Sequence, residues 1–290
     1  MSSPPRPEPS PPPKIQDQVA TLLRDLVHER TGIYFETDRL EMMIEKLEPR
    51  AIALGCDSYL DYYYILKYDD RGAEEWLRVM DAFSVQETYF WRESDQIRAL
   101  VDHVVPQHFL SSNLPFRIWS AACATGEEPY SLVIALREAG WGNHPIEIHA
   151  SDASQAALAK ARSCLYRERS FRSLPAGLRE KYFESEGDSS RLRPEISSRV
   201  TFHWANLVRL DETESLAGTM NVIFCRNVFI YFSTATIQRV VDVFAQRVPP
   251  GGHLFIGASE SLLKLTSHFD LKEFHGAFAY VRNQLLAPDV

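Results

Sequence analysis

The sequence predicts an α/β protein: a doubly wound, mostly parallel sheet with an antiparallel hairpin at its C-terminal end, preceded by a small all-α domain. Three observations lead to this fold class. Apolar residues follow a helical period through residues 15–85, and short apolar runs alternate with helical segments after Pro115. Two further runs around Gly276, residues 271–274 and 277–281, predict the hairpin. Strands that alternate with helices are typical of parallel sheets covered on both faces.

The composition is that of a globular protein and excludes several classes of function. The chain has 290 residues, of which 45% are hydrophobic and 24% are charged, enough for a substantial core. The net charge of −8 at pH 7 argues against a nucleic-acid partner. The four cysteines are scattered and form no C-x-x-C pair, so we expect reduced thiols and no metal site.

Neither a membrane segment nor a secretion signal is apparent. No apolar run approaches the ~18 residues of a membrane-spanning helix, so we expect no direct membrane insertion. The N-terminus lacks the apolar region of a signal peptide, which favours a cytoplasmic protein. Residues 1–14 are mostly proline and serine and predict a disordered leader rather than a ligand for a proline-binding module.

Residues 15–85 are predicted to form a small all-helical domain of four helices. The first begins near Ile15 and ends at Thr31-Gly32, and the others cover residues 38–55, 58–67 and 73–83. On the second helix, acidic and basic residues alternate, which predicts a solvated face of mixed charge. These residues are Arg39, Glu41, Glu45, Lys46, Glu48 and Arg50.

Residues 86–115 are predicted to be a linker followed by a connecting helix over residues 96–110. The linker contains an aromatic triplet at residues 89–91 that interrupts the helical period. The local sequence leaves two interpretations open. Either the aromatic side chains join two hydrophobic cores, or the segment forms the rim of a ligand cleft, with Thr88 and Arg92 facing the ligand.

After Pro115 the chain alternates between strands and helices. Two of the runs, 221–225 and 253–257, are continuously apolar, as expected of parallel strands buried on both faces. The other predicted strands cover residues 116–119, 146–151 and 200–204, and the predicted helices cover residues 127–139, 153–164 and 234–247.

A loop of small residues follows the first strand. From Ser120 to Gly126 no side chain is large, so a ligand can approach the backbone closely. Glu127 and Glu128 suit the positive end of the helix that begins there, and Pro129 is tolerated in its first turn. The two carboxylates would repel a pyrophosphate, so the loop favours a nucleoside with hydroxyls or a cationic centre over a nucleotide.

Polar residues follow several of the predicted strands, where ligands bind in sheets of this kind. They are Asp152, Asn206 and the pair Arg226-Asn227. Asp152 comes 26 residues after Gly126, a position suited to hydrogen bonds with ribose hydroxyls, although it also suits a helix cap. The G-x-G-x-x-G motif of nicotinamide enzymes is absent.

Two long stretches, residues 120–131 (SAACATGEEPYS) and 223–232 (IFCRNVFIYF), resemble the signature motifs of the CheR family of chemotaxis methyltransferases. Residues 86–92 (QETYFWR) are similar to the family's N-x-T-x-F-F-R segment. The resemblance covers nearly all of residues 15–285. It implies a Rossmann-like methyltransferase domain over residues 116–286, with a small β-subdomain inserted at residues 165–200.

The resemblance also implies an activity and its residues. Members of the family esterify glutamates of chemoreceptors with S-adenosylmethionine as the cofactor, which leaves as S-adenosylhomocysteine. The expected partner is the cytoplasmic helical bundle of a chemoreceptor, and the expected state is a monomer. Arg92 and Tyr231 are expected close to the transferred methyl group. The expected cofactor contacts are Gln86, Thr88, Arg92, Ala122, Gly126, Glu127, Asp152, Asn206, Leu207, Arg226 and Asn227.

The residue types fit this chemistry. A glutamate carboxylate, with a pKa of about 4.3, is already an anion at neutral pH, so no general base is needed. The cofactor carries an activated methyl group, and the protein has only to align the reacting atoms. A guanidinium such as that of Arg92 and a phenol such as that of Tyr231 are suited to orienting a carboxylate.

Three departures from the family pattern bear on the substrate. Gln86 stands where the family has asparagine. The second helix carries Glu41, Glu45 and Glu48 where the family's receptor-binding helix tends to be basic. Members that bind a receptor's C-terminal pentapeptide carry a glycine-rich loop in the β-subdomain, whereas residues 185–190 contain one glycine. We therefore expect no pentapeptide tether.

Two other functions stay open. One is a methyltransferase of the same fold that acts on another protein or on a small carboxylate. The other is a non-catalytic adaptor that binds S-adenosylmethionine as a sensor.

Overall fold

The computed structural model describes residues 15–284, except 213–215, 217 and 275. The predicted leader, residues 1–14, and the last residues of the predicted methyltransferase domain lie outside the described part. The chain divides between Ser84 and Val85 into two compact units.

The first unit is all-helical, as predicted. It contains α1 (Asp17–Thr31), a 3-10 turn η1 (Thr37–Arg39), α2 (Leu40–Ala53), α3 (Tyr59–Tyr68) and α4 (Gly72–Phe83). Gly32 ends α1 in the left-handed conformation, with φ of 77°. Ser58 caps α3, since its hydroxyl accepts a hydrogen bond from the Asp61 amide.

Two basic residues of α2 turn toward their own unit. Arg50 forms an ion pair with the buried Glu75 at 2.6 Å, and Tyr62 donates a hydrogen bond to the same carboxylate. Lys46 donates to the carbonyl oxygen of Ala82. Because these two cations are engaged internally, the exposed surface of α2 is more acidic than its sequence indicates, with Glu41 and Glu45 in solvent.

The second unit is built on a seven-stranded sheet in the order β6-β2-β1-β7-β8-β10-β9. The first five of these strands run parallel and the last three form antiparallel pairs, as predicted. The strands are β1 (Phe116–Ala121), β2 (Ile146–Asp152), β6 (Val200–Trp204), β7 (Val222–Cys225), β8 (His253–Ile256), β9 (Phe269–Phe274) and β10 (Ala277–Arg282).

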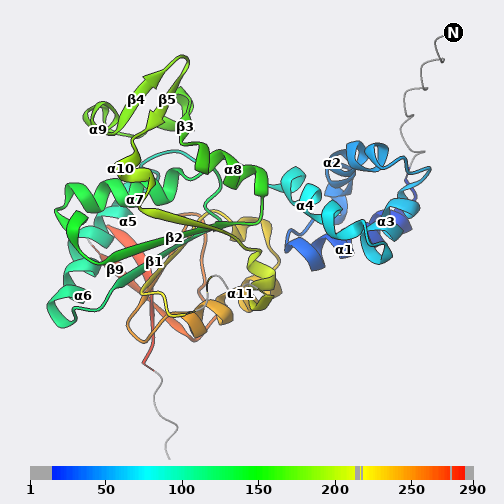
Figure 1. Ribbon diagram of the computed structural model, residues 1–290. Coiled ribbons are helices and arrows are strands. Elements are labelled where there is room, and N and C mark those ends of the chain that lie inside the picture. Colours follow the sequence, from blue (N-terminus) through cyan, green and yellow to red (C-terminus); the bar gives the residue numbers. More distant parts are fainter. Residues whose placement is uncertain (1–14, 213–215, 217, 275, 285–290) are drawn as a thin grey trace, which may run out of the picture. The chain divides into compact units, whose positions relative to one another are not determined.

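Helices cover both faces of the sheet. Figure 1 shows α7 (Glu127–Glu138) and α8 (Gln155–Ser163) on one side and α11 (Thr234–Arg247) on the other. The two faces have separate hydrophobic cores, one around Ile118, Leu132 and Phe224, the other around Trp119 and Phe244. Short 3-10 turns connect several elements: η3 (Trp141–Asn143), η4 (Glu168–Phe171), η5 (Leu207–Glu212) and η7 (Phe229–Tyr231).

The predicted connecting helix contains a π-helical turn that its sequence period does not reveal. It runs as α5 (Ser94–Ala99), the π segment η2 (Leu100–Val104) and α6 (Val105–Ser111). Pro106 is the second residue after the π segment. Proline has no amide to donate and its ring would clash with the carbonyl four residues earlier, and a wider turn relieves both effects.

The insertion predicted at residues 165–200 is a separate three-stranded antiparallel sheet in the order β3-β5-β4. Its strands are β3 (Leu165–Tyr166), β4 (Phe183–Glu186) and β5 (Ser189–Leu192), accompanied by α9 (Ala176–Tyr182) and α10 (Pro194–Ser197). In Figure 1 this sheet stands beyond α7, away from the large sheet.

The order of the strands locates a ligand site. The chain leaves β1 toward β2 and β6 and then returns to β7 on the other side of β1. In doubly wound sheets the ligand lies at the carboxyl ends of the strands where this reversal occurs. Here the reversal falls between β1 and β7, which places the loops after residues 121 and 225 at the site.

Candidate functional site

The loop after β1 is a tight turn of small residues. Ala122, Ala124 and Gly126 adopt left-handed conformations, with φ of 58°, 47° and 91°. A Cβ atom on Gly126 would come within 2.9 Å of the Cβ of Ala161, so a larger residue does not fit there. Gly126 is therefore packed against α8, whereas Ala122 and Ala124 are the half-buried residues of the turn.

Asp152, at the end of β2, braces this loop. One carboxylate oxygen accepts a hydrogen bond from the Ala124 amide at 2.9 Å, and the other accepts from the Ser154 amide at 2.8 Å. The N-cap of α8 is Ser154, whose hydroxyl accepts a hydrogen bond from the Ala157 amide at 3.0 Å, so the interpretation of Asp152 as the helix cap is wrong. A carboxylate at the end of this strand is of the residue type that accepts hydrogen bonds from ligand hydroxyls.

The Glu127 side chain is buried and held by two hydroxyl groups. Thr125 donates to one oxygen at 2.6 Å and Ser170 donates to the other at 2.9 Å. Ser170 belongs to η4 in the inserted segment, and its carbonyl accepts a hydrogen bond from the Phe90 amide. The insertion thus fixes one of the carboxylates predicted to contact the cofactor.

Arg226 and Glu128 form a buried ion pair, with 2.6 Å between the Arg226 Nε and a Glu128 oxygen. The Ser120 hydroxyl donates to the other Glu128 oxygen at 2.6 Å. The Arg226 Nη1 donates to the carbonyl oxygen of Arg92 at 2.9 Å. The Arg226 side chain is only 2% exposed, so we interpret its guanidinium as a support for the segment that carries Arg92. A contact between Arg226 and the cofactor stays a prediction.

The two residues predicted to act on the substrate lie within electrostatic reach of each other. Burial raises the pKa of Tyr231, the charge of Glu87 raises this pKa further, and the positive charge of Arg92 lowers it. The guanidinium of Arg92 donates to the carbonyl oxygen of Glu87 at 3.1 Å and is 5.5 Å from the ring centre of Tyr89. Tyr231 is 36% exposed, which leaves its hydroxyl accessible.

The segment before Arg92 does not join two hydrophobic cores, because Phe90 and its aromatic neighbours all belong to one core, and its place at the rim of a ligand cleft stays a prediction. Phe90 is fully buried against the rings of Tyr166, Phe171 and Phe183, so it joins the linker to the inserted β-sheet. Gln86, Thr88 and Arg92 are half-buried on the same segment. The aromatic side chain packs, and the polar ones remain available to a ligand.

The remaining predicted contacts follow β6 and β7. Asn206 caps the turn after β6, where its side-chain oxygen accepts a hydrogen bond from the Val208 amide at 3.1 Å. Leu207 is buried in the core beside α11. Asn227 follows β7 with φ of 60°, a left-handed conformation that asparagine tolerates better than most residues.

Two polar residues in this region have no counterpart among the sequence-based predictions: Ser170, described above, and Glu260. Glu260 follows β8, and its carboxylate accepts backbone hydrogen bonds from the turn after β7. An acidic residue shortly after a buried strand is the signal that identified Asp152. The same signal, applied to the strand at 253–256, identifies Glu260.

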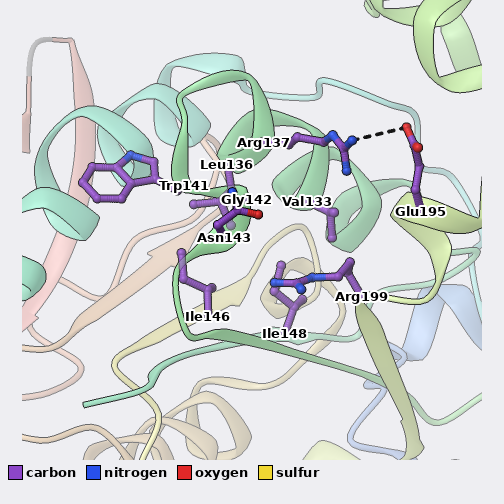
Figure 2. Close-up of a pocket in the computed structure, with 10 residues that line it drawn as sticks. All are labelled: Val133, Leu136, Arg137, Trp141, Gly142, Asn143, Ile146, Ile148, Glu195 and Arg199. Atoms are coloured by element: carbon purple, nitrogen blue, oxygen red, sulfur yellow. Dashed lines mark ion pairs between the residues drawn. The ribbon is translucent and has the colours of Figure 1, made fainter. Parts of the chain in front are cut away.

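A cavity of about 210 Å³ lies elsewhere in the second unit (Figure 2). It is bounded by α7, η3 and the first half of β2, the end of the strand opposite Asp152. Arg137 and Glu195 form an ion pair beside it, with 3.7 Å between the charged atoms. None of the residues that line it belongs to the predicted site.

The comparison with family models decides the classification. Residues 86–277 match the model of the CheR methyltransferase SAM-binding domain, and residues 21–84 match that of the CheR methyltransferase all-alpha domain. The chain belongs to the CheR methyltransferase family. It is therefore a methyltransferase that uses S-adenosylmethionine, and the resemblance stated from the sequence is confirmed.

Similarity to individual relatives supports this classification. Chemotaxis protein methyltransferase 2 of Vibrio cholerae is 36% identical over 266 residues, 89% of this chain and 91% of the relative. The chemotaxis protein methyltransferase of Salmonella typhimurium is 33% identical, with 85% of each chain covered. The probable biofilm formation methyltransferase WspC of Pseudomonas putida is 33% identical over 89% of this chain and 60% of its own length.

The residues of the site fit the cofactor of the CheR family. The turn at residues 122–126 carries no bulky side chain, and a carboxylate such as that of Asp152 is of the residue type that suits ribose hydroxyls. Glu127 is 2% exposed and both of its oxygens accept hydrogen bonds from hydroxyls, so its contact with the cofactor stays a prediction. Glu128, which the sequence placed as a second negative charge, is neutralised by Arg226. Among the described residues, no group of three or more His, Cys, Asp or Glu side chains is arranged to hold a metal ion. Nor is any helix in the described ranges both long and apolar enough to cross a bilayer.

Proposed function

We propose that the protein transfers the methyl group of S-adenosylmethionine to glutamate side chains of chemoreceptors and forms methyl esters. The observation that carries the proposal is that Arg92 lies near enough to Tyr231 for its positive charge to lower the pKa of the phenol, beside the turn after β7. A cation and a phenol are suited to binding an anionic carboxylate, and this reaction needs no base to activate it.

The cofactor supplies an electrophilic methyl group on a sulfonium, and the protein supplies its binding and the position of the acceptor. The turn 122–126, Asp152 and Glu127 would hold the cofactor, together with Gln86, Thr88, Asn206, Leu207 and Asn227. Their rigidity is favoured by the hydrogen bonds among Ala124, Asp152 and Ser154. Fixed positions matter because proximity and alignment account for most of the catalysis available here.

Arg92 and Tyr231 act on the substrate. The guanidinium of Arg92 would pair with one carboxylate oxygen and orient the other toward the methyl group. Its carbonyl oxygen is held by Arg226, which limits the movement of the segment. The phenol of Tyr231 would donate a hydrogen bond to the carboxylate, since burial raises its pKa and keeps it protonated at neutral pH.

The proposed partner is the cytoplasmic helical bundle of a chemoreceptor, methylated by a monomer in the cytoplasm. The net charge of −8 is unfavourable for a nucleic-acid partner. The exposed acidic residues of α2, Glu41 and Glu45, would repel an acidic receptor surface. They favour a receptor with more basic residues where this helix docks. The similarity to a biofilm methyltransferase favours a receptor of a non-motility array as the second candidate.

We further propose that the enzyme works without a pentapeptide tether. The turn between β4 and β5 carries one glycine, Gly187, with φ of 58°. The remaining residues of this loop have side chains that restrict close approach of a peptide backbone. Calorimetry with isolated C-terminal receptor pentapeptides is expected to show no binding at millimolar peptide, and micromolar binding would contradict this part of the proposal.

The activity is tested with S-adenosylmethionine labelled in its methyl group and receptor fragments from the same genome. We expect label to enter the fragment and to be released as methanol by mild base, as esters are. The Arg92→Ala variant should incorporate little label under the same conditions. Label that resists base, or that enters no fragment, contradicts the assignment to receptor glutamates.

A further inference from the structure

The carboxylate of Glu260 lies at the centre of four backbone hydrogen bonds. One oxygen accepts from the amides of Val228 and Phe229 at 2.8 and 2.7 Å. The other accepts from the amides of Asn227 and Gly257 at 2.8 and 2.6 Å. No water or ligand is needed to satisfy these donors, because one side chain satisfies all four.

Three of the donors are consecutive amides of the turn after β7. Asn227 adopts a left-handed conformation with φ of 60°, and Val228 follows with φ of −117° and ψ of −41°. Successive amides in such a turn point to one side and form a concave binding site for an anion. The Glu260 carboxylate is the anion in this binding site and accepts the hydrogen bonds of the three amides.

The same turn carries the residues assigned to chemistry. Arg226 and Asn227 begin it, and the Tyr231 amide donates to the carbonyl of Val228 at 3.0 Å. The position of the Tyr231 phenol thus depends on the backbone that Glu260 holds. The charge of Glu260 also acts on Tyr231, where it raises the pKa of the phenol.

The neighbouring glycine is shaped for this arrangement. A Cβ atom on Gly257 would lie 2.5 Å from the Asn227 Nδ2 and 2.9 Å from the Asn227 amide nitrogen. It would also lie 2.9 Å from a Glu260 oxygen. A side chain at this position would therefore separate the carboxylate from the turn, so Gly257 allows the close contact that the hydrogen bonds need.

We propose that Glu260 is a positioning residue of the methyl-transfer site: its carboxylate fills the anion-binding turn at residues 227–229 and so fixes Asn227 toward the cofactor and Tyr231 toward the substrate. The inference rests on the proposed function for the role of Tyr231. The role of Glu260 in positioning Asn227 depends only on the family's use of S-adenosylmethionine. Glu260 touches neither reacting group in this account and acts through the backbone.

The test removes the carboxylate and then returns it as a free ion. The Glu260→Ala variant lacks the side-chain CH2 and carboxylate that acetate resembles. We expect its affinity for S-adenosylhomocysteine, measured by calorimetry in chloride buffer, to fall at least tenfold. Acetate at the same ionic strength should restore most of this loss, because it can occupy the vacant turn.

Methyl transfer to a receptor fragment is measured in parallel. In Glu260→Ala we expect the rate at saturating cofactor and fragment to fall at least tenfold, with partial recovery in acetate and a receptor KM within threefold of wild type. Glu260→Gln, which places an amide donor against two backbone donors, should lose activity and show no acetate recovery. Rates are normalised to the folded fraction from circular dichroism.

Glu138→Gln is the matched control. Like Glu260, Glu138 is a carboxylate that accepts hydrogen bonds, here two, from Lys181 and Tyr182. It lies at the C-terminal end of α7, remote from the carboxyl ends of the strands. We expect wild-type affinity and rate. A Glu260→Ala protein with wild-type cofactor affinity, or a loss that acetate does not reverse, overturns the proposal. If wild type methylates no receptor fragment, the proposed substrate fails while the cofactor measurement still decides the role of Glu260.

Discussion

Three carboxylates of the site each accept hydrogen bonds from neighbouring loops, and each fixes a different segment. Asp152 holds the turn after β1, Glu127 joins the helix start to the inserted segment, and Glu260 holds the turn after β7. Backbone amides and hydroxyls that bond a carboxylate gain more than those that bond a neutral acceptor. The loops at the switch point of the sheet are therefore held by charge-assisted contacts within the protein.

Arg92 is the residue whose side chain the account assigns most directly to the substrate. Replacing it with alanine removes the cation that orients the carboxylate, and we expect a loss of methyl-transfer rate of ~100-fold, the order found when an electrostatic donor is removed from an active site. Tyr89→Phe keeps the ring that stacks on Arg172 at 3.7 Å and should change the rate less than threefold. Initial rates of label transfer distinguish the two, and equal effects would remove Arg92 from the site.

The ion pair of Arg226 with Glu128 is expected to contribute to the free energy of unfolding. Arg226→Met leaves the Glu128 charge buried without its partner, which should lower the free energy of unfolding by ~3–5 kcal/mol. The double variant Arg226→Met, Glu128→Leu should recover part of this loss, because the charge of Glu128 is removed while that of Glu93, 3.7 Å from the Arg226 guanidinium in the wild type, remains. Urea unfolding of both variants measures the difference. A double variant as unstable as the single one would show that the loss does not come from the unpaired charge of Glu128.

At the scale of elements, the inserted β-sheet is connected to the site through the segment at residues 87–92. Phe90 packs in the insertion, and the Phe90 amide donates to the carbonyl oxygen of Ser170 at 2.9 Å. The Tyr166 hydroxyl donates to the Thr125 carbonyl at 2.9 Å. The insertion thus contacts the loop after β1 and the Arg92 segment, and part of the cofactor site depends on it.

Phe90→Ala tests this connection. The ring is fully buried among three aromatic side chains, so its loss should cost ~3–5 kcal/mol of unfolding free energy. Phe90→Leu, which keeps most of the volume, should cost less than half as much. Chemical denaturation measures both, and a cost below ~1 kcal/mol for alanine would mean that the insertion is held by other contacts.

The sequence predicts the order and type of the elements well and the details of loops poorly. Two of the parallel strands are short, continuous apolar runs, such as residues 221–225, and every residue of β7 and β8 is buried. The π turn at residues 100–104 and the contact of Ser170 with Glu127 depend on tertiary neighbours that no local pattern encodes. Motif similarity located Arg226, but only the three-dimensional structure places its guanidinium against Glu128 rather than in open space.

At the scale of the whole molecule, the balance of buried ionisable groups sets the dependence of stability on pH. His253, at the start of β8, is buried and neutral, and burial with the nearby charge of Lys272 lowers its pKa to about 4. An unfolded histidine has a pKa of about 6.5. The unfolded state therefore takes up the proton first as the pH falls.

The sign of the effect follows from this order. The contribution of His253 to stability is complete above about pH 6.5 and is lost as the pH falls to about 4, where the loss reaches about 3 kcal/mol. Carboxylates titrate in the same range, so wild type is compared with His253→Gln. We expect the variant to lose less stability than wild type between pH 7 and pH 4. Parallel curves from urea unfolding would contradict a buried neutral His253.

The enzyme is proposed to transfer its methyl group to glutamate carboxylates of a receptor. The most direct measurement is tandem mass spectrometry of a receptor fragment after incubation with the enzyme and S-adenosylmethionine. We expect an added mass of about 14 Da per methyl group, located on glutamate side chains and removed by mild base, which hydrolyses an ester. The same mass on lysine, arginine or another side chain, stable to base, would contradict it.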